Sequence, residues 1–386
     1  MGTSPTKSAL LAAGDLYGLL ALNRATFGSA VMARGYASTG DLKMLGDGTD
    51  INTLWDEFQK TVEQANADRG ALVDLLTFRT ADKSDQVLQA PAGTAEFEDA
   101  SEYGVPVGSR AEAAVVSLGY DFRWKDLATR YTWQYLADAT SGQVESLHNG
   151  ALAADSRLQY KTVLGALFNP SNRTSASTDA EIKALWNGDG SEIPEFEGNS
   201  FSPTHTHYTT TESVTLAPAD VEFLQGQVLE HGYGEVDGAQ LVILCNRTEG
   251  DVIAGWRAGV GGAKFDFISS DTSVPYLTTE QLVGSRPAGN FRGLKVTGQY
   301  GHALIAPTSL VPVGYVVCVA VGSSTPVIGL REHSRMRGLQ IIRGNNSDYP
   351  LIDSYYVHGI GAGVRQRGAA AVLQVTVSAA YSAPAL

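Results

Sequence analysis

The sequence predicts an α+β fold, in which helices and strands occupy separate regions of the chain. Apolar residues recur at three- and four-residue steps in two long segments, 51–66 and 131–168, as in amphipathic helices. Two unbroken apolar runs, 240–246 and 315–321, have the length and composition of buried strands. Glycine accounts for 42 of the 386 residues and charged residues for 18 %, against usual shares of about 7 % and about 25 %, which favours a chain rich in turns and strands.

Composition also limits the possible functions. The chain has 28 Lys and Arg against 41 Asp and Glu, which gives a formal net charge of −13. A protein that holds DNA or RNA through its phosphates needs a basic face, so this charge argues against a nucleic-acid-binding role. The hydrophobic content of 43 % is enough for a substantial core, so we expect an ordered protein.

The first 50 residues contain a helix-like piece at 8–22 but too few large apolar residues for a core of their own. We interpret residues 1–50 as an arm that needs another surface, such as a neighbouring copy of the chain, because ordering its backbone costs about 1–2 kcal/mol per residue. A helix is predicted from residue 51 to about 66. Its apolar face consists of Ile51, Leu54, Trp55, Phe58 and Val62.

A long hairpin and a long helix are expected next. Segments 72–80 and 113–124 are predicted strands, joined by about 30 mostly polar residues that we expect to project outward. The periodic segment 131–168 predicts one helix, with a possible bend near Gly142 or Gly150. Asn169-Pro170 ends it, because a residue before proline is disfavoured in the helical region.

Residues 170–215 are interpreted as loops and edge strands. A helix is then predicted from Pro218, with Asp220 in its first turn and Gly232 as a left-handed cap after its end. The apolar run 240–246 predicts a strand covered by helices. Further strands are expected at 265–268, 293–298, 315–321 and 364–377.

The two cysteines, Cys245 and Cys318, lie in apolar runs and are interpreted as buried thiols. Two cysteines cannot form a disulfide framework or a four-thiolate metal site, and this usage fits a reducing compartment. The longest apolar stretch, 315–321, is far shorter than the about 20 residues of a membrane-spanning helix. We expect neither a membrane segment nor a signal peptide.

Several patterns could carry chemistry, and each has a simpler structural interpretation. His205 and His207 could form a metal pair, but the sequence identifies no third ligand near them. The glycines in 359–363 and 259–262 resemble phosphate-binding loops, yet neither motif has the Gly-Lys-Ser/Thr ending or a strand-to-helix setting. We interpret these glycines as turn residues.

The remaining candidates are weaker still. Neither cysteine lies in an electropositive setting, and no nucleophile elbow or zinc-protease helix is present. Carboxylates such as Glu96, Glu98 and Asp155 are interpreted as solvated charges, and the sequons at Asn172 and Asn246 are not expected to be used without a signal peptide. We therefore predict no catalytic, cofactor-binding or metal-binding residues and favour a structural or binding protein over an enzyme.

Several stretches are similar to major capsid proteins of tailed bacteriophages, especially those of phages of actinobacteria. The resemblance covers roughly residues 50–376. It is carried by SEYGVPVGSRAEAAVVSLGYDFRWKDLATRYTWQYL at 101–136, TVLGALFNP at 162–170, FSPTHTHY at 201–208, LEHGYG at 229–234, VIGLREH at 327–333 and RGNNSDYPLIDSYYVHGIGAGVRQRGAAAVLQVT at 343–376.

This resemblance implies the Hong Kong 97-type fold, with an N-arm, an extended E-loop hairpin, a spine helix, a peripheral domain and an axial domain. The implied divisions are 1–50 for the N-terminal arm, 51–130 for a helix plus the E-loop hairpin (the E-loop with its flanks at 70–124), 131–216 for the spine helix (131–168) and peripheral domain, 217–342 for the axial domain, and 343–386 for a strand returning to the peripheral domain.

The implied function is shell building, in which copies assemble as pentamers and hexamers into an icosahedral head that encloses double-stranded DNA without sequence-specific binding. The family implies assembly in the host cytoplasm, no cofactor, a portal, possible decoration proteins and, because only 50 residues precede the first core helix, a separate scaffolding protein. Some members join subunits by a Lys–Asn bond. Lys83 lies in the E-loop-like segment, but no motif identifies its partners, so we assign no cross-link.

Two alternatives stay open at this point. An encapsulin-type compartment shell shares the fold but carries enzymes, and nucleic acid in purified particles separates it from a virus. A glycine-loop enzyme that binds a nucleotide is the other alternative. Ligand-induced melting shifts of the isolated chain would distinguish that enzyme from a shell protein.

Overall fold

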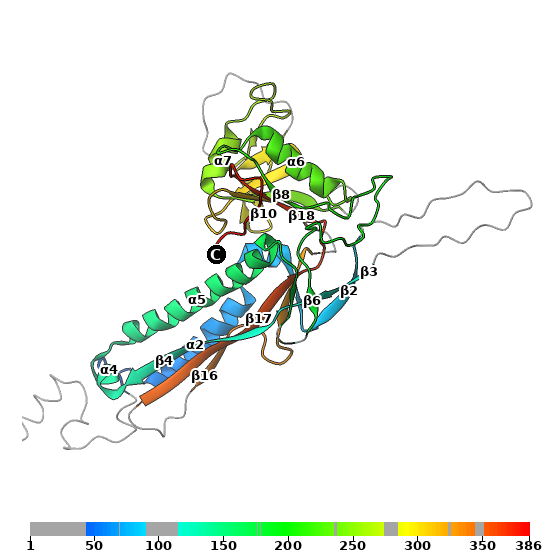
Figure 1. Ribbon diagram of the computed structural model, residues 1–386. Helices are drawn as coiled ribbons and strands as arrows, with labels where there is room; N and C mark the ends of the chain where they lie inside the picture. Colours follow the sequence, from blue (N-terminus) through cyan, green and yellow to red (C-terminus); the bar gives the residue numbers. More distant parts are fainter. Residues whose placement is uncertain are drawn as a thin grey trace, which may run out of the picture. The chain divides into compact units, whose positions relative to one another are not determined.

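The computed structural model describes residues 44–68, 70–89, 115–175, 177, 179–234, 238–273, 285–322, 326–343 and 351–386 (Figure 1). Most of the expected N-terminal arm, the centre of the expected E-loop and the carboxylates Glu96 and Glu98 lie outside these residues. The chain divides into two compact units. The first comprises the described residues of Met1–Asp68, Lys125–Asp155 and Gly338–His358, and the second those of Arg69–Trp124, Ser156–Arg337 and Gly359–Leu386.

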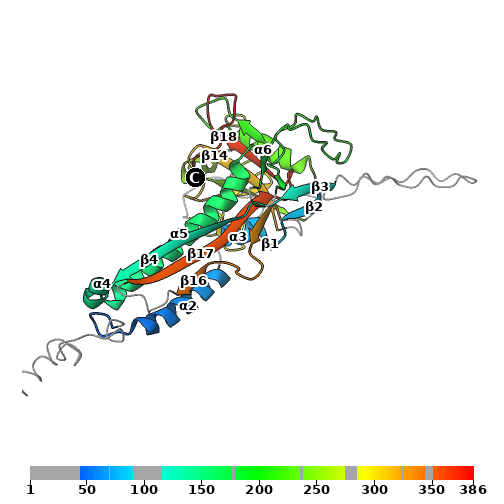
Figure 2. The ribbon, with the colours of Figure 1, turned by 60° about the horizontal axis from the view of Figure 1, so that its bottom comes forward.

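The first unit contains α2 (Ile51–Ala67), which matches the predicted first helix almost residue for residue. Asp50 caps it by accepting a hydrogen bond from the backbone N–H of Asn52 at 2.8 Å. All five residues of the predicted apolar face are buried. α2 packs against β16 (Gln340–Arg343), as Figure 2 shows, and β16 pairs antiparallel with the first half of β17 (Leu351–Val364).

The expected single helix over 131–168 is wrong at its beginning. Tyr131 and Thr132 are the last residues of β4 (Arg123–Thr132), which pairs with β17. Thr132 then caps the short α4 (Trp133–Asp138), and Ala139 has extended backbone, so the long helix α5 (Ser141–Phe168) begins only afterwards. Gly142 and Gly150 lie inside α5 and do not break it, since the intrahelical hydrogen bonds outweigh a cost of about 1 kcal/mol per glycine.

The second unit is built around a seven-stranded sheet with the order β7-β18-β14-β8-β13-β12-β9. β8 (Gln240–Cys245) and β14 (Tyr315–Val321) match the two predicted buried strands and pair antiparallel with each other. The other members are β7 (Tyr208–Thr210), β9 (Ile268–Ser269), β12 (Gly298–Tyr300), β13 (Ala303–Pro307) and β18 (Ala370–Gln374).

Two helices pack against this sheet. α6 (Pro218–Leu229) contacts β14 and β18, and α7 (Arg247–Ala254) contacts β8 and β13 (Figure 1). Proline begins α6, and Gly232 follows its end with a positive φ of 82°, as the sequence predicts. Because the helices and the rest of the unit cover both faces of the sheet, β8 is buried on both sides. This burial explains why β8 lacks the alternation of a half-exposed strand.

The predicted strand over 72–80 is partly wrong. Residues Ala71–Leu76 form the helix α3, because Leu72, Val73 and Leu76 lie on one helical face and are buried together. Only Thr77–Thr80 form a strand, β1, which pairs in parallel with β15 (Ile328–Glu332). β15 pairs in turn with the second half of β17, so residues distant in sequence meet in this sheet.

The predicted hairpin exists, but its strands differ from the expected ones. Its described base consists of β2 (Ser84–Leu88) and β3 (Val115–Gly119), paired antiparallel from Ser84↔Gly119 to Leu88↔Val115. The expected strand over 113–124 is interrupted at 120–122, where Asp121 accepts a hydrogen bond from the N–H of Phe122. A break is needed because β3 pairs with β2 whereas β4 pairs with β17.

The expected strand over 265–268 is reduced to its last residue, Ile268, in β9. The small strands β5 (Arg173–Thr174), β6 (Glu181–Ile182), β10 (Asn290–Phe291) and β11 (Leu294–Lys295) form two two-stranded sheets, β5-β6 and β10-β11. Short strands and loops over 170–215 agree with the sequence interpretation. Among the described residues, none of the helices combines the length and the apolarity needed to span a lipid bilayer.

Candidate functional site

Three histidines of the second unit lie together, although the sequence indicates only two of them. His205 and His207 lie in the segment just before β7, and His231 lies just after the end of α6. The Nε2 atom of His205 lies 3.1 Å from Nε2 of His207 and 3.3 Å from Nε2 of His231. The third residue could not be found from sequence, because it is 24 positions beyond His207 and joins the pair only through the packing of α6.

The rings of this histidine cluster are held in place from outside. Nδ1 of His207 lies 2.6 Å from the carbonyl oxygen of Ala370, at the start of β18. Phe201 stacks on His231 with ring centroids 4.1 Å apart. His207 and His231 are buried and His205 is half-buried, so the cluster is a built feature of the unit and has limited access to solvent.

Burial sets the protonation state of these histidines. It lowers the pKa of His205, and it lowers the pKa of His207 to about 3 in spite of the hydrogen bond to Ala370, which acts in the opposite direction. Burial, followed by the neighbouring His207 and His205, also holds the pKa of His231 well below its usual value. All three imidazoles are therefore neutral near pH 7, and each has one nitrogen lone pair available.

The glycine motif at 359–363 lies in the strand β17 and does not form a phosphate-binding loop. A Cβ atom at Gly361 would overlap the carbonyl oxygen of Asp121, and one at Gly359 would contact the rings of Phe122 and Trp124 at less than 3 Å. These glycines allow close packing of backbone and rings, so their expected role as turn residues is wrong. In the second motif, Gly259, Gly261 and Gly262 have positive φ and lie in turns, as expected.

Both cysteines are buried and free, as the sequence predicts. Burial, with a contribution from nearby Glu249 and Asp251, raises the pKa of Cys245 to about 12, and burial alone raises that of Cys318 further. A thiol with such a pKa is protonated at neutral pH. It is therefore a poor nucleophile and a poor metal ligand.

The other sequence candidates have structural partners. Asn172 donates its Nδ2 hydrogen bond to Asp189 at 2.7 Å, and Asn246 caps α7 while its Nδ2 donates to the carbonyl oxygen of Val311. Lys83 is exposed, and its carbonyl oxygen accepts from the N–H of Tyr120 next to the β2–β3 hairpin. The interpretation of Asp155 as a solvated charge is wrong, because it is buried and contacts His358.

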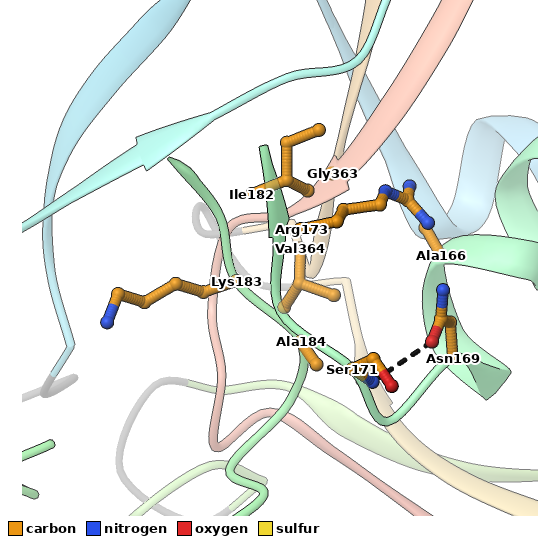
Figure 3. Close-up of a pocket in the computed structure, with 9 residues that line it drawn as sticks. All are labelled: Ala166, Asn169, Ser171, Arg173, Ile182, Lys183, Ala184, Gly363 and Val364. Atoms are coloured by element: carbon orange, nitrogen blue, oxygen red, sulfur yellow. Dashed lines mark hydrogen bonds between the residues drawn. The ribbon is translucent and has the colours of Figure 1, made fainter. Parts of the chain in front are cut away.

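A recess in the second unit lies between the end of α5 and the neighbouring short strands (Figure 3). Ala166, Asn169, Ser171, Arg173, Ile182, Lys183, Ala184, Gly363 and Val364 line it. Its empty volume of about 190 Å³ includes open solvent and is below the about 300–1,000 Å³ of typical ligand pockets. This recess is too small and open to support a substrate or cofactor site.

Comparison with solved structures decides the family. A structure described as "Mycobacterium phage Patience" is 37 % identical to this chain, with a TM-score of 0.69 and coverage of 89 % of this chain and 94 % of the other. The chain belongs to the major capsid proteins of tailed bacteriophages. The expected Hong Kong 97-type fold is confirmed, and this capsid protein is a structural protein of the icosahedral virion shell.

Two further structures are more distant. The asymmetric unit of the bacteriophage PhiM1 mature capsid is 9 % identical, with a TM-score of 0.49 and coverage of 80 % of this chain and 87 % of the other. The holo-SrpI encapsulin complex from Synechococcus elongatus PCC 7942 is 14 % identical, with a TM-score of 0.44 and coverage of 82 % and 90 %. These similarities are too weak to add to the assignment. No protein-family model and no curated protein sequence matches the chain.

Proposed function

We propose that this capsid protein assembles as pentamers and hexamers, and that its residues 1–50 and the loop carried by β2 and β3 supply contacts between subunits. The support is the hairpin base, whose strands pair over five residues and carry 25 residues, 90–114, between Gln89 and Val115. A loop of this length within a compact domain is unusual unless it binds something. Many modest contacts, repeated around a closed lattice, stabilise a shell without one tight interface.

The base of this hairpin is anchored on its own subunit. The side chain of Gln89 donates to the carbonyl oxygen of Arg365 at 2.9 Å and accepts from the N–H of Arg367 at 2.9 Å. The hydroxyl of Tyr233 donates to Oε1 of Gln366 at 2.6 Å and lies 3.3 Å from the carbonyl oxygen of Gln89. An anchored base allows a loop to transmit force between subunits without loosening the fold that carries it.

The domain roles follow the same proposal. We assign the seven-stranded sheet with α6 and α7 to the axial domain, and α5 to the spine of the peripheral domain. The return segment 343–386 contains β17 and β18, and β18 pairs with β14 and β7 in the seven-stranded sheet. In this proposal residues 370–374 therefore strengthen the axial sheet, while β17 serves the peripheral domain.

The remaining partners are also proposals. We expect a separate scaffolding protein and a portal, with decoration proteins as optional partners, assembly in the host cytoplasm and no enzymatic activity of the capsid protein itself. The net charge of −13 suits a wall that encloses DNA without trapping it, because few cations are available to displace the counterions of the phosphates. DNA in purified particles would distinguish this shell from an enzyme-carrying compartment.

A loop replacement tests the proposed role of the hairpin. Replacing residues 90–114 by a three-residue linker leaves a four-residue loop that still includes Gln89, a length that antiparallel strands accept. We expect the variant to fold, as judged by circular dichroism, but to form no closed shells when its genomic neighbours are co-expressed. Wild-type yields of shells from this variant would contradict the proposal.

A further inference from the structure

We propose that His205, His207 and His231 bind one divalent transition-metal ion, with Zn²⁺ as the ion that best fits the three nitrogen ligands. This site goes beyond shell building. Each residue offers one ring nitrogen, and the three nitrogens lie within 4.8 Å of one another. Imidazole suits zinc, copper and nickel, and zinc sites with three protein ligands keep a fourth position for water.

The spacing of the Nε2 atoms fits a shared ion. A tetrahedral zinc ion with Zn–N bonds of about 2.0–2.1 Å places neighbouring ligand nitrogens about 3.3 Å apart. The two Nε2 distances from His205, 3.1 Å to His207 and 3.3 Å to His231, agree with this geometry.

Proton counting also favours an ion over hydrogen bonds alone. Nδ1 of His207 must donate to Ala370, because a carbonyl oxygen only accepts, so Nε2 of His207 carries a lone pair. Nε2 of His205 faces both that lone pair and Nε2 of His231. To bond to His207 this atom must carry the proton and donate it, and one N–H cannot make a second full hydrogen bond to His231. One metal ion accepts the lone pairs of all three rings.

The surroundings resemble the outer shell of a metal site. The bond from His207 to Ala370 fixes the ring orientation and its tautomer, as the second partner of a metal-bound histidine usually does. The side chain of Gln227 on α6 donates to the carbonyl oxygen of Thr206 at 2.8 Å and so holds the residue between His205 and His207. Lone pairs are free near pH 7 because burial keeps the imidazoles neutral.

A buried cation, Arg367, acts on the histidine cluster. The buried Arg367 contributes to the low pKa of His207, so its charge disfavours a metal ion. Its Nη2 atom, however, lies 3.0 Å from Oδ2 of Asp189, and the guanidinium stacks over the ring of Trp186 at 4.2 Å. The carboxylate carries the opposite charge and offsets part of the arginine's field. A bound ion would join the segment before β7 to the end of α6 and stabilise the unit.

Zinc binding by the full-length chain tests this site. Tag-free protein is stripped with a chelator, loaded with zinc, freed of excess metal and analysed by elemental mass spectrometry. We expect one zinc per chain, an increase in melting temperature on zinc addition, and a tetrahedral Co²⁺ absorption spectrum. Loss of an outer-shell partner weakens metal binding by about 10–100-fold. His205→Gln and His231→Gln each remove a direct ligand and should weaken zinc binding by at least as much.

His302→Gln is the matched control, because this histidine is exposed and lies outside the cluster. It should keep wild-type stoichiometry and affinity. Circular dichroism separates a lost ligand from a lost fold, and His205→Gln is the safer variant because its side chain is only half-buried. The proposal is overturned if the folded wild-type chain takes up no stoichiometric zinc, or if both folded ligand variants keep wild-type affinity.

Discussion

Oδ1 of Asp155 on α5 lies 2.5 Å from Nδ1 of His358 on β17, and only 8 % and 1 % of the two side chains are exposed. Both residues belong to the first unit. Their contact links a helix to a strand that is 203 positions away in sequence. A polar contact at this depth is costly to break, because the group left behind has lost its hydration.

Asp155→Ala should therefore reduce the free energy of unfolding by about 1–3 kcal/mol, the range for a buried group that loses its partner. Urea denaturation of the unassembled chain measures this change. Glu145→Ala, on an exposed part of the same helix, is the control and should change stability by less than about 0.5 kcal/mol. Equal effects of the two substitutions would show that the buried contact contributes nothing.

Arg367→Lys should destabilise the chain by about 1–3 kcal/mol, because buried acceptors lose their donors. The fully buried guanidinium donates to the carbonyl oxygen of Ala184, to Oδ1 of Asn187 and to Asp189, and an ammonium group cannot reproduce this fork. Arg365→Lys is the control two residues away. Arg365 pairs with Asp85 at a partly exposed position, so its substitution should cost at most about 1 kcal/mol. Similar melting temperatures for the two variants would refute this ranking.

Glycine substitutions should have opposite effects in α5 and β17. Gly150→Ala should stabilise the chain by about 0.5–1 kcal/mol, because nothing lies within 4 Å of the added Cβ and alanine is the better helix former. Gly361→Ala should instead destabilise it, because the Cβ meets the backbone of Asp121. Thermal unfolding of the two variants measures both signs. A stable, well-folded Gly361→Ala chain would disprove the close backbone approach.

Stability of the metal-free chain should fall as pH decreases from 6 to 5. The pKa of His207 is about 3 in the folded chain and near 6.5 in the unfolded chain, so the unfolded state binds more protons between these values. Each such histidine should then cost about 1.4 kcal/mol per pH unit. Asp189 does not contribute in this window, because its pKa is lowered below the ordinary value of 3.8.

His231→Gln removes one titrating group and should make this slope shallower by about 1.4 kcal/mol per pH unit, whatever its effect on absolute stability. Urea denaturation at several pH values, with a chelator present, gives the slope. The control is Ser171→Ala, an exposed residue without a titratable side chain, which should leave the slope unchanged. An identical slope in wild type and His231→Gln would mean that His231 is not neutral and buried in the folded chain.

Local patterns predicted the elements that depend on local physics. The face of α2, the cap and proline of α6 and the buried strands β8 and β14 follow from residue spacing alone. The sequence predictions were wrong where contacts distant in sequence decide whether a segment forms a helix or a strand. Tyr131 and Thr132 can continue a helix, but pairing of β4 with β17 keeps them in a strand, and Leu72–Leu76 form a helix because the core receives one helical face.

The candidate site likewise contains residues that a local pattern reveals and a residue that only tertiary packing brings in. His205 and His207 are visible as a pair because a two-residue step places both rings on one side of an extended segment. His231 is brought to them by the packing of α6 on β14 and β18, which no local pattern contains. The role of Gly361 was likewise hidden, because a close approach between backbones leaves no mark on neighbouring residues. Family membership came from long similar strings and from a solved relative.

Electron microscopy of the wild-type chain, co-expressed with its genomic neighbours, tests the central claim most directly. A shell-building protein should sediment as large particles that are closed, icosahedral and composed mainly of this chain. A folded chain that remains monomeric under every such condition, with no particles in any fraction, would contradict the assignment.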